Sequence, residues 1–380
     1  MKRRILINAS TCVVGGGVQV AAGFLHHLHA RLDVIGWEVA VVVSPQVLGE
    51  CVHLGPKPGW RMMAIAPSPA SLIRGMGSRR KIHALIRDFQ PEGCFTVFGP
   101  SYLWLGIPEV SGFADPSVTN PNKFFLRNHG MLAALRTRFN GMVKRLAVRR
   151  VRRFWVETET ARRGLALRLG IPEGRIEVIP NVVNTLFVPD AAGPPASRIR
   201  FLYLSAFYPH KNHAFLLPVA QALREERPGL EFEFVVTLPE SSAAWITLRD
   251  SFARAGLEDC VRTLGRLGIR ECPAAYRDAH VVFHPSLLEV FSASYLEAFA
   301  ARRPLVATDL DFAREACGDA AIYFHPDCPA EAARALQSAA SDPERRAGLI
   351  EAGLLRLRSG LTAEDKNERL LSLIKNSIWP

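Results

Sequence analysis

Two glutamates, Glu289 and Glu297, stand eight positions apart where an apolar segment gives way to a helical pattern. Ser292 and Ser294 lie between them, and serine is favoured at helix N-caps. A helix start presents unpaired N–H groups and partial positive charge that attract phosphate, whereas carboxylates accept hydrogen bonds from hydroxyl groups. The pattern favours a ligand with both phosphate and hydroxyl groups, such as a nucleotide sugar. The alternative is two acids that only serve the helix dipole.

The elements that would position these glutamates alternate regularly along the chain. Strand-like segments of a first series are expected at 3–8, 37–44, 93–99 and 153–158, and those of a second series at 198–207, 231–237, 259–265, 280–286, 304–309 and 320–325. Helical patterns fit between them. Strands that alternate with helices predict the α/β class, with parallel sheets and helical crossovers.

A Pro/Gly/Ala-rich segment, 189–198, separates the two series and is typical of a linker. We therefore expect two doubly wound, Rossmann-like domains at 1–185 and 186–365, and a C-terminal helix at 366–380 whose packing the sequence leaves open. Ligands of open parallel sheets bind at the carboxyl ends of the strands. The predicted site is thus a cleft across which the two domains face each other.

Composition narrows the class of protein. Of the 380 residues, 48% are hydrophobic and 22% charged, which is typical of a globular protein. The seven cysteines form no CxxC pair, which favours free thiols over a disulfide framework or a zinc site. The N-terminal apolar run is too short for a signal peptide, and no segment approaches the roughly 20 apolar residues of a membrane span. We expect a cytoplasmic protein.

The net charge of +11 is concentrated between Arg127 and Arg163, where eleven Lys or Arg residues accompany two acids. Such a segment indicates an anionic partner. An apolar stripe from Leu132 to Leu146 predicts a helix in this segment, whose basic face either is simply solvated or attaches to the anionic inner surface of a membrane. Nucleic acid is disfavoured because no nucleic-acid module accompanies the charge.

The segment "PSLLEVFSASYLEAFAARRPLVAT" resembles the donor-binding motif of glycosyltransferase family 4, the retaining group 1 enzymes of GT-B fold. Further motifs in the family's order are "ILINASTCVVGGGVQVAAGFLHHL", "RIEVIPNVVNTLF", "YPHKNHAFLLPVAQAL" and "TLGRLGIRECPAAYRDAHVVFHPS". The resemblance covers most of the chain and is weakest at 45–130. It implies a retaining transferase that moves a sugar from a nucleoside-diphosphate sugar to a glycan or lipid-linked acceptor, in cell-surface polysaccharide synthesis.

The resemblance also implies roles for particular residues. Glu297 would accept hydrogen bonds from the ribose, Glu289 would contact the transferred sugar, and Lys211 would stabilise charge on the departing diphosphate. The backbone amides that would touch the diphosphate are those of Phe291, Ser292 and Ala293. The glycines that would face the donor from the first domain are Gly15, Gly16 and Gly17. The family's chemistry implies neither a metal nor a cofactor besides the donor.

Three positions of the second predicted domain depart from the family pattern. Ala206 stands five residues before Lys211, where the family commonly has an arginine, and Arg266 is the candidate to replace that cation. Val290 and Ser292 occupy two positions that are glycine in the family. Serine keeps the backbone amide and adds a hydroxyl, whereas valine crowds the loop.

A sugar-nucleotide epimerase of GT-B fold is one competing interpretation, but the glutamate motif favours transfer. Two other functions also compete. A nicotinamide dehydrogenase would need GxGxxG directly after the first strand, but the third glycine position is Val20, which excludes that class. The second is a catalytically silent subunit that binds a sugar nucleotide or a partner protein. This alternative stays open because Ala206 removes a cation from the diphosphate site, and because Ala114 stands before Asp115 where the family often has a histidine.

Overall fold

The structure is a computed structural model that describes residues 2–71, 74–127, 146–188 and 198–380. It divides into two compact units. Unit 1 comprises 1–120, 131–180 and 362–380, and unit 2 comprises 121–130 and 181–361. Compared with the predicted domains, the segments 121–130 and 181–185 belong to unit 2 and residues 362–365 belong to unit 1. The C-terminal helix, whose packing the sequence leaves open, also belongs to unit 1.

Unit 1 is a parallel seven-stranded sheet in the order β3-β2-β1-β4-β5-β6-β7. Its strands are β1 (Arg4–Ala9), β2 (Glu38–Val43), β3 (Trp60–Ala64), β4 (Gly93–Thr96), β5 (Glu109–Gly112), β6 (Val151–Val156) and β7 (Ile176–Val178). Its helices are α1 (Gly15–Ile35), α2 (Pro45–Glu50), α3 (Met76–Phe89), α4 (Pro116–Thr119), α7 (Glu159–Leu169) and α15 (Ala363–Ile378). Strands buried on both faces, such as the "EVAVVV" of β2, are almost continuously apolar, as parallel sheets require.

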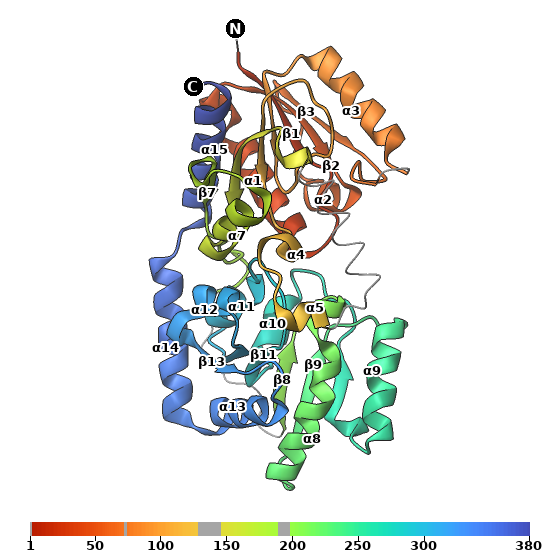
Figure 1. Cartoon of the computed structure of the whole chain (residues 1–380), viewed down its shortest axis with the longest axis vertical. Coiled ribbons are helices and arrows are strands. Elements are labelled where there is room, and N and C mark those ends of the chain that lie inside the picture. The colour runs from red at the N-terminus through yellow and green to blue at the C-terminus, as the bar shows by residue number, and fades with distance from the viewer. Residues whose placement is uncertain (1, 72–73, 128–145, 189–197) are drawn as a thin grey trace. The chain divides into compact units, whose positions relative to one another are not determined.

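Unit 2 is a parallel six-stranded sheet in the order β10-β9-β8-β11-β12-β13. Its strands are β8 (Ile199–Tyr203), β9 (Phe232–Val236), β10 (Val261–Thr263), β11 (Val281–His284), β12 (Leu305–Thr308) and β13 (Ala321–Phe324). Its helices are α5 (Lys123–Arg127), α8 (Leu216–Glu226), α9 (Ala243–Arg254), α10 (Cys272–Arg277), α11 (Ala293–Ala300), α12 (Asp311–Cys317), α13 (Pro329–Ser341) and α14 (Pro343–Ser359). Figure 1 labels four strands of unit 2, β8, β9, β11 and β13.

Two hydrophobic clusters cover the two faces of the second sheet. One cluster joins the sheet to α8, α9 and α13, and the other joins it to α10, α11 and α12. α11 is additionally covered by α14, where Gly353 lies so close to the Phe299 ring that a Cβ would approach ring atoms to 2.7 Å. Both faces of β11 are thereby buried, and its carboxyl end is the place where polar side chains gather.

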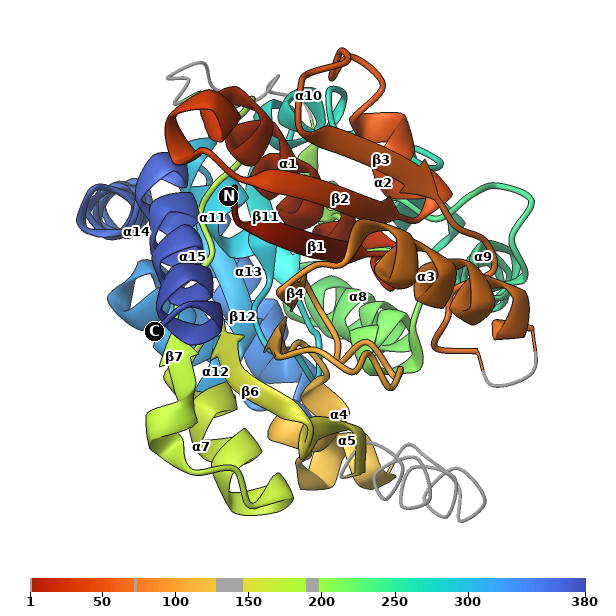
Figure 2. The same cartoon turned by 90° about the horizontal axis from the view of Figure 1, so that it is seen from above.

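The last helix, α15, packs on unit 1, beside β6 (Figure 2). It begins with a capping box, in which the Thr362 side chain accepts from the Asp365 amide and the Asp365 carboxylate accepts from the Thr362 amide. Its buried face includes Lys366, next to Glu157 at the end of β6. The sequence had left this packing open.

The predicted fold class is confirmed, because both sheets are parallel and lie between helices. Every expected strand is present to within a few residues at its ends, but β3, β5 and β7 were not predicted. The seven cysteines are free thiols, as expected. Most of the predicted basic helix and the linker at 189–197 lie outside the described residues. No helix of the described residues is long and apolar enough to cross a membrane.

Candidate active site

The segment between β11 and α11 carries the first glutamate at the centre of unit 2. β11 and β8 are neighbours in the sheet, so the segments that follow their carboxyl ends, 285–292 and 204–212, lie side by side. The amide of Leu287 donates to the carbonyl of His210 at 2.7 Å, which ties these two loops together. Parallel topology therefore brings Lys211 from one loop to Glu289 on the other.

Lys211 and Glu289 form a largely buried ion pair, with 2.5 Å between Nζ and Oε1. Lys211 ends a short 3₁₀ turn (Pro209–Lys211), and its carbonyl accepts a hydrogen bond from the Tyr203 hydroxyl at 2.6 Å. Burial is the largest single influence and raises the pKa of Glu289, but the charge and hydrogen bond of Lys211, together with smaller contributions that include a hydrogen bond from Ser286, hold the pKa of this carboxyl below its ordinary value. Glu289 is therefore an anion at neutral pH and a hydrogen-bond acceptor.

The second glutamate, Glu297, lies in the second turn of α11 and is 8% exposed. Its Oε2 accepts a hydrogen bond of 2.7 Å from the hydroxyl of Tyr276 in α10. Burial raises the pKa of Glu297 above its ordinary value, and the Tyr276 hydrogen bond opposes part of that rise. The two glutamates therefore have opposite electrostatic environments, one paired with a cation and one with a phenol.

The start of α11 lies between the two glutamates. Ser292 is the N-cap residue, but its side chain makes no capping hydrogen bond. Its hydroxyl is instead 3.0 Å from Nε2 of His284, the last residue of β11. Nε2 is also 3.8 Å from Oε1 of Glu289, and Nδ1 is 3.4 Å from the hydroxyl of Tyr295. Burial lowers the pKa of His284 to about 3, so the imidazole is neutral.

The remaining predicted residues are distributed over both units. Phe291 and Ala293, which flank Ser292, are half-buried at the start of α11. Arg266 is exposed in the loop after β10, and among the described residues no hydrogen bond or ion pair joins it to either glutamate. Ala206 is exposed in the loop that follows β8. The roles predicted for these residues stay predictions.

The three glycines form the first turn of α1 in unit 1 rather than the loop before it. Gly15 and Gly16 are exposed, and a Cβ built on either would meet no atom of the described residues within 4 Å. Gly15 has φ +57°, a conformation that favours glycine. Their predicted contact with the donor stays a prediction.

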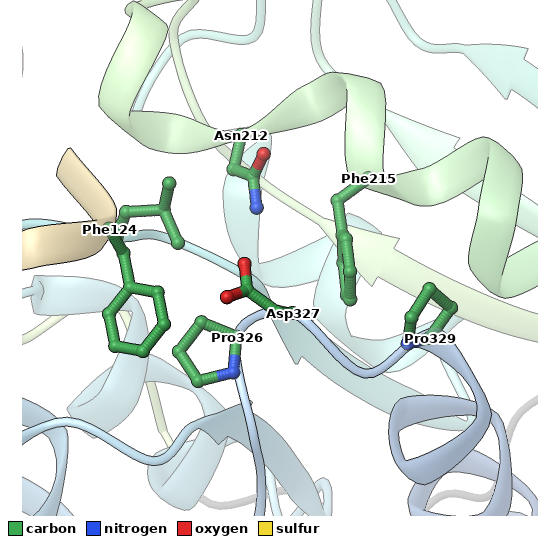
Figure 3. Close-up of a pocket in the computed structure, with 7 residues that line it drawn as sticks. Phe124, Asn212, Phe215, Pro326, Asp327 and Pro329 are labelled. Atoms are coloured by element: carbon green, nitrogen blue, oxygen red, sulfur yellow. The ribbon is translucent and has the colours of Figure 1, made fainter. Parts of the chain in front are cut away.

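A pocket of about 260 Å³ adjoins the Lys211 loop in unit 2 (Figure 3). It is lined by Phe124, Asn212, Phe215, Leu287, Pro326, Asp327 and Pro329. The Asn212 amide and the Asp327 carboxylate point toward one another across it, between apolar walls. The helix α5, which unit 2 gains from the first half of the chain, forms one side, and Asn122 just before it donates to the Leu287 carbonyl at 2.7 Å.

Sequence reasoning missed His284, Tyr276 and Tyr203. A histidine inside an otherwise apolar buried strand, "VVFH", was a usable signal for the first, because a buried imidazole needs hydrogen-bond partners. The two tyrosines carried no such signal, since their partners are defined only by the packing of α10 on α11 and of β8 beside the Lys211 turn.

Comparison with known families accounts for this arrangement. The family model described as "Glycosyltransferase Family 4" matches residues 14–187, and the model "Glycosyl transferases group 1" matches residues 198–342. The chain belongs to the group 1 glycosyltransferases of family 4. The first model covers the strands β2 to β7 of the first sheet, and the second model covers all six strands of the second sheet.

Curated relatives of this glycosyltransferase are distant in sequence. It is 23% identical to the D-inositol 3-phosphate glycosyltransferase of Pseudarthrobacter chlorophenolicus over 90% of this chain and 86% of the relative. It is 23% identical to the O-antigen chain mannosyltransferase RfbU of Salmonella typhimurium over 48% of this chain and 49% of the relative, so that match spans about half of RfbU.

Solved structures show the same GT-B fold. Sucrose-phosphate synthase of Thermosynechococcus elongatus superposes with a TM-score of 0.75 at 18% identity, covering 99% of both chains. HepE of Anabaena, solved in complex with UDP and glucose, superposes with a TM-score of 0.74 at 16% identity, covering 98% of this chain and 100% of HepE. The predicted GT-B class is thus confirmed.

Proposed function

We propose that this glycosyltransferase moves a sugar from a nucleoside-diphosphate sugar to a glycan or lipid-linked acceptor, with retention of the anomeric configuration. The observation that carries the proposal is the pairing of Lys211 with Glu289 beside the uncapped start of α11, one helical turn before Glu297. A cation, free helix amides and two carboxylates meet the needs of a diphosphate and of sugar hydroxyls. The UDP-glucose complex of HepE supports a nucleotide-sugar donor.

In this proposal the protein acts mainly on the leaving group. Lys211 and the amides of Phe291, Ser292 and Ala293 stabilise the charge that develops on the departing diphosphate, an effect worth about 3 kcal/mol for one well-aimed donor. Glu289 is ionised and accepts hydrogen bonds from the transferred sugar, while Glu297 accepts them from the ribose. The acceptor hydroxyl attacks the face that the diphosphate leaves, and the leaving phosphate takes its proton.

Turnover by the purified protein tests this function directly. A panel of UDP-, GDP- and ADP-sugars is first ranked by thermal shift, since a ligand that binds only the folded state raises its apparent stability. The best donor is then incubated with candidate acceptors, nucleotide release is followed with and without EDTA, and the anomeric configuration of the product is read by NMR. We expect retained configuration and no loss of rate with EDTA. An inverted product would contradict the mechanism.

A catalytically silent subunit is the second candidate. This candidate is favoured by the exposed Ala206, which stands at the family's arginine position. Lys211 is then the one cation predicted for the diphosphate in the segment 204–212, and Glu289 already balances its charge. Such a subunit would bind the donor in the thermal-shift panel but release no nucleotide, even with the correct acceptor. Release above the rate of a Lys211→Met control would exclude it.

We further propose that the enzyme works at the cytoplasmic surface of a membrane in polysaccharide synthesis. In the part of the basic segment that the structure describes, Arg149 and Arg150 are exposed, and the Arg150 guanidinium lies 4.3 Å from the ring centre of Trp104. Trp104 is 69% exposed, and tryptophan is enriched at membrane–water interfaces. Seven free cysteines support a reducing compartment.

Vesicle sedimentation tests this location. We expect binding to vesicles of anionic phospholipid that weakens as salt rises, because screening reduces attraction between exposed charges. Vesicles of neutral phosphatidylcholine are the control, and Trp104→Ala should weaken the anionic binding further. Equal sedimentation with both kinds of vesicle, or insensitivity to salt, would contradict an electrostatic attachment.

A further inference from the structure

The serine that begins α11 does not do what serine usually does at a helix N-cap. An N-cap serine normally accepts a hydrogen bond from a backbone amide one turn into the helix, and Ser242, at the start of α9, does so from the Trp245 amide at 3.2 Å. Ser292 makes no such bond. Its backbone carbonyl accepts from the Tyr295 amide, but its hydroxyl turns toward His284.

The surroundings of His284 define which ring nitrogen carries the proton. The ring is fully buried and neutral, so it has one N–H and one acceptor nitrogen. The anionic Oε1 of Glu289 is 3.8 Å from Nε2, which favours the tautomer with the proton on Nε2. Nδ1 then accepts from the Tyr295 hydroxyl, and Nε2–H donates to the Ser292 oxygen at 3.0 Å. The hydroxyl hydrogen of Ser292 is left to donate elsewhere.

We propose that His284 is a positioning residue that keeps the Ser292 hydroxyl from capping α11, so that the helix start keeps its full positive charge and the hydroxyl itself can bind the diphosphate of the donor. This inference rests on the proposed function of the site. Where the family has glycine, this chain has Ser292, whose hydroxyl is held by a hydrogen bond from His284. The extra O–H donor offsets the cation that is missing at Ala206.

The alternative position of Ser292 shows why the histidine matters. Without the Nε2–H donor, the serine hydroxyl would turn back and cap the helix, and a cap of this kind shifts an equilibrium about fivefold. The cap would take the amide of Ser294 or Tyr295, so the diphosphate would then meet a helix start whose partial positive charge is partly offset. It would also lose the hydroxyl donor, and a hydrogen bond to a charged group is worth about tenfold in binding.

A double-mutant cycle tests this, with dissociation constants for UDP, GDP and ADP measured by calorimetry and the tightest nucleotide used throughout. We expect Ser292→Gly to bind about tenfold more weakly than wild type, because the hydroxyl is lost. His284→Leu should bind about fifty-fold more weakly, because the serine also caps the helix. The double variant should return to the level of Ser292→Gly, about fivefold tighter than His284→Leu.

This rescue separates positioning from a purely structural role. A histidine that only fills space would leave the double variant at least as weak as His284→Leu, and that result would overturn the proposal. His284→Gln is the conservative control, since its amide N–H can take the place of Nε2–H, and it should stay within about threefold of wild type. If His284→Leu does not fold, the test compares the dissociation constants of His284→Gln, Ser292→Gly and Tyr295→Phe. Tyr295→Phe removes the hydroxyl that donates to Nδ1 of His284, so the proton is no longer held on Nε2 and nucleotide binding should weaken.

The outcomes also distinguish this inference from the proposed function. Wild-type protein that binds none of the three nucleotides would refute the donor site, and the inference with it. Wild-type binding with equal dissociation constants in His284→Leu and Ser292→Gly would refute the inference alone and leave the donor site standing.

Discussion

Replacement of Lys211 by methionine should damage stability and catalysis through two different causes. Methionine keeps much of the length of the lysine side chain and removes its charge. Glu289 would then keep its burial and lose its counter-ion. The pKa of this carboxyl, which now lies below its ordinary value, would rise, since burial is the largest influence on it and the main opposing one would be lost.

The size of the stability loss follows from the burial of the pair. The side chains of Lys211 and Glu289 are 16% and 9% exposed. Removal of one partner from a buried pair costs about 3–5 kcal/mol, and the partial exposure of the lysine places the expected loss near the lower limit, about 3 kcal/mol at pH 7.5. The loss should shrink toward pH 5. The stabilisation from the wild-type carboxylate is complete above its unfolded pKa of about 4.3 and is therefore retained at pH 5, whereas the unpaired carboxyl of the variant is relieved by protonation as pH falls.

The matched control is the double variant Lys211→Met/Glu289→Gln, which removes both charges and keeps both shapes. Urea denaturation should show that most of the lost stability returns, because no unpaired buried charge remains. Nucleotide release should stay about 100-fold below wild type in both variants, because one preplaced cation contributes about 3 kcal/mol to the transition state. Stability and activity would thereby separate.

Two results would refute this reasoning. If Lys211→Met kept more than a third of the wild-type rate, the lysine would not stabilise the leaving diphosphate. If its stability loss were the same at pH 5 and pH 7.5, the cause would not be an unpaired Glu289 carboxylate.

Three further predictions concern other buried polar groups. Glu297→Ala should lower kcat/KM at least tenfold in initial-rate assays with an unchanged circular dichroism spectrum; a normal rate would remove this residue from the donor site. His284 and His213 are buried, and burial lowers their pKa values to about 3 and about 4, below the unfolded value of about 6.5. The unfolded chain therefore binds protons more readily below pH 6.5, and each histidine should lower the free energy of unfolding by about 2 kcal/mol at pH 5 in urea titrations. His213→Phe should make stability depend less on pH; an unchanged dependence would contradict this. Lys366→Met should destabilise the protein by about 3 kcal/mol in the same titrations, because Glu157 would stay buried beside α15 without its cation. The second substitution Glu157→Gln should restore most of the lost stability, and no recovery would argue against a buried charge pair.

The sequence by itself determined the class of fold, the two series of strands and the motif around Glu289 and Glu297. These features depend on local patterns: alternating apolar segments for parallel strands, and serine with acids for a helix start. The sequence did not predict β3, β5 and β7, because these strands are short or lie where motif resemblance is weakest. Short strands take their order from neighbours distant along the chain rather than from their own composition.

Only the tertiary structure decided which side chains of the candidate site contact and hydrogen-bond one another. Lys211 and Glu289 are 78 positions apart, and they meet because β8 and β11 are adjacent in the sheet. The Tyr276 hydrogen bond to Glu297 depends on the packing of α10 against α11. The Ser292 hydroxyl could bond either to a backbone amide of α11 or to His284, and the packed structure places it at His284. A side-chain hydrogen bond is directional and needs its partner within about 3 Å, and such distances arise from packing rather than from residue type.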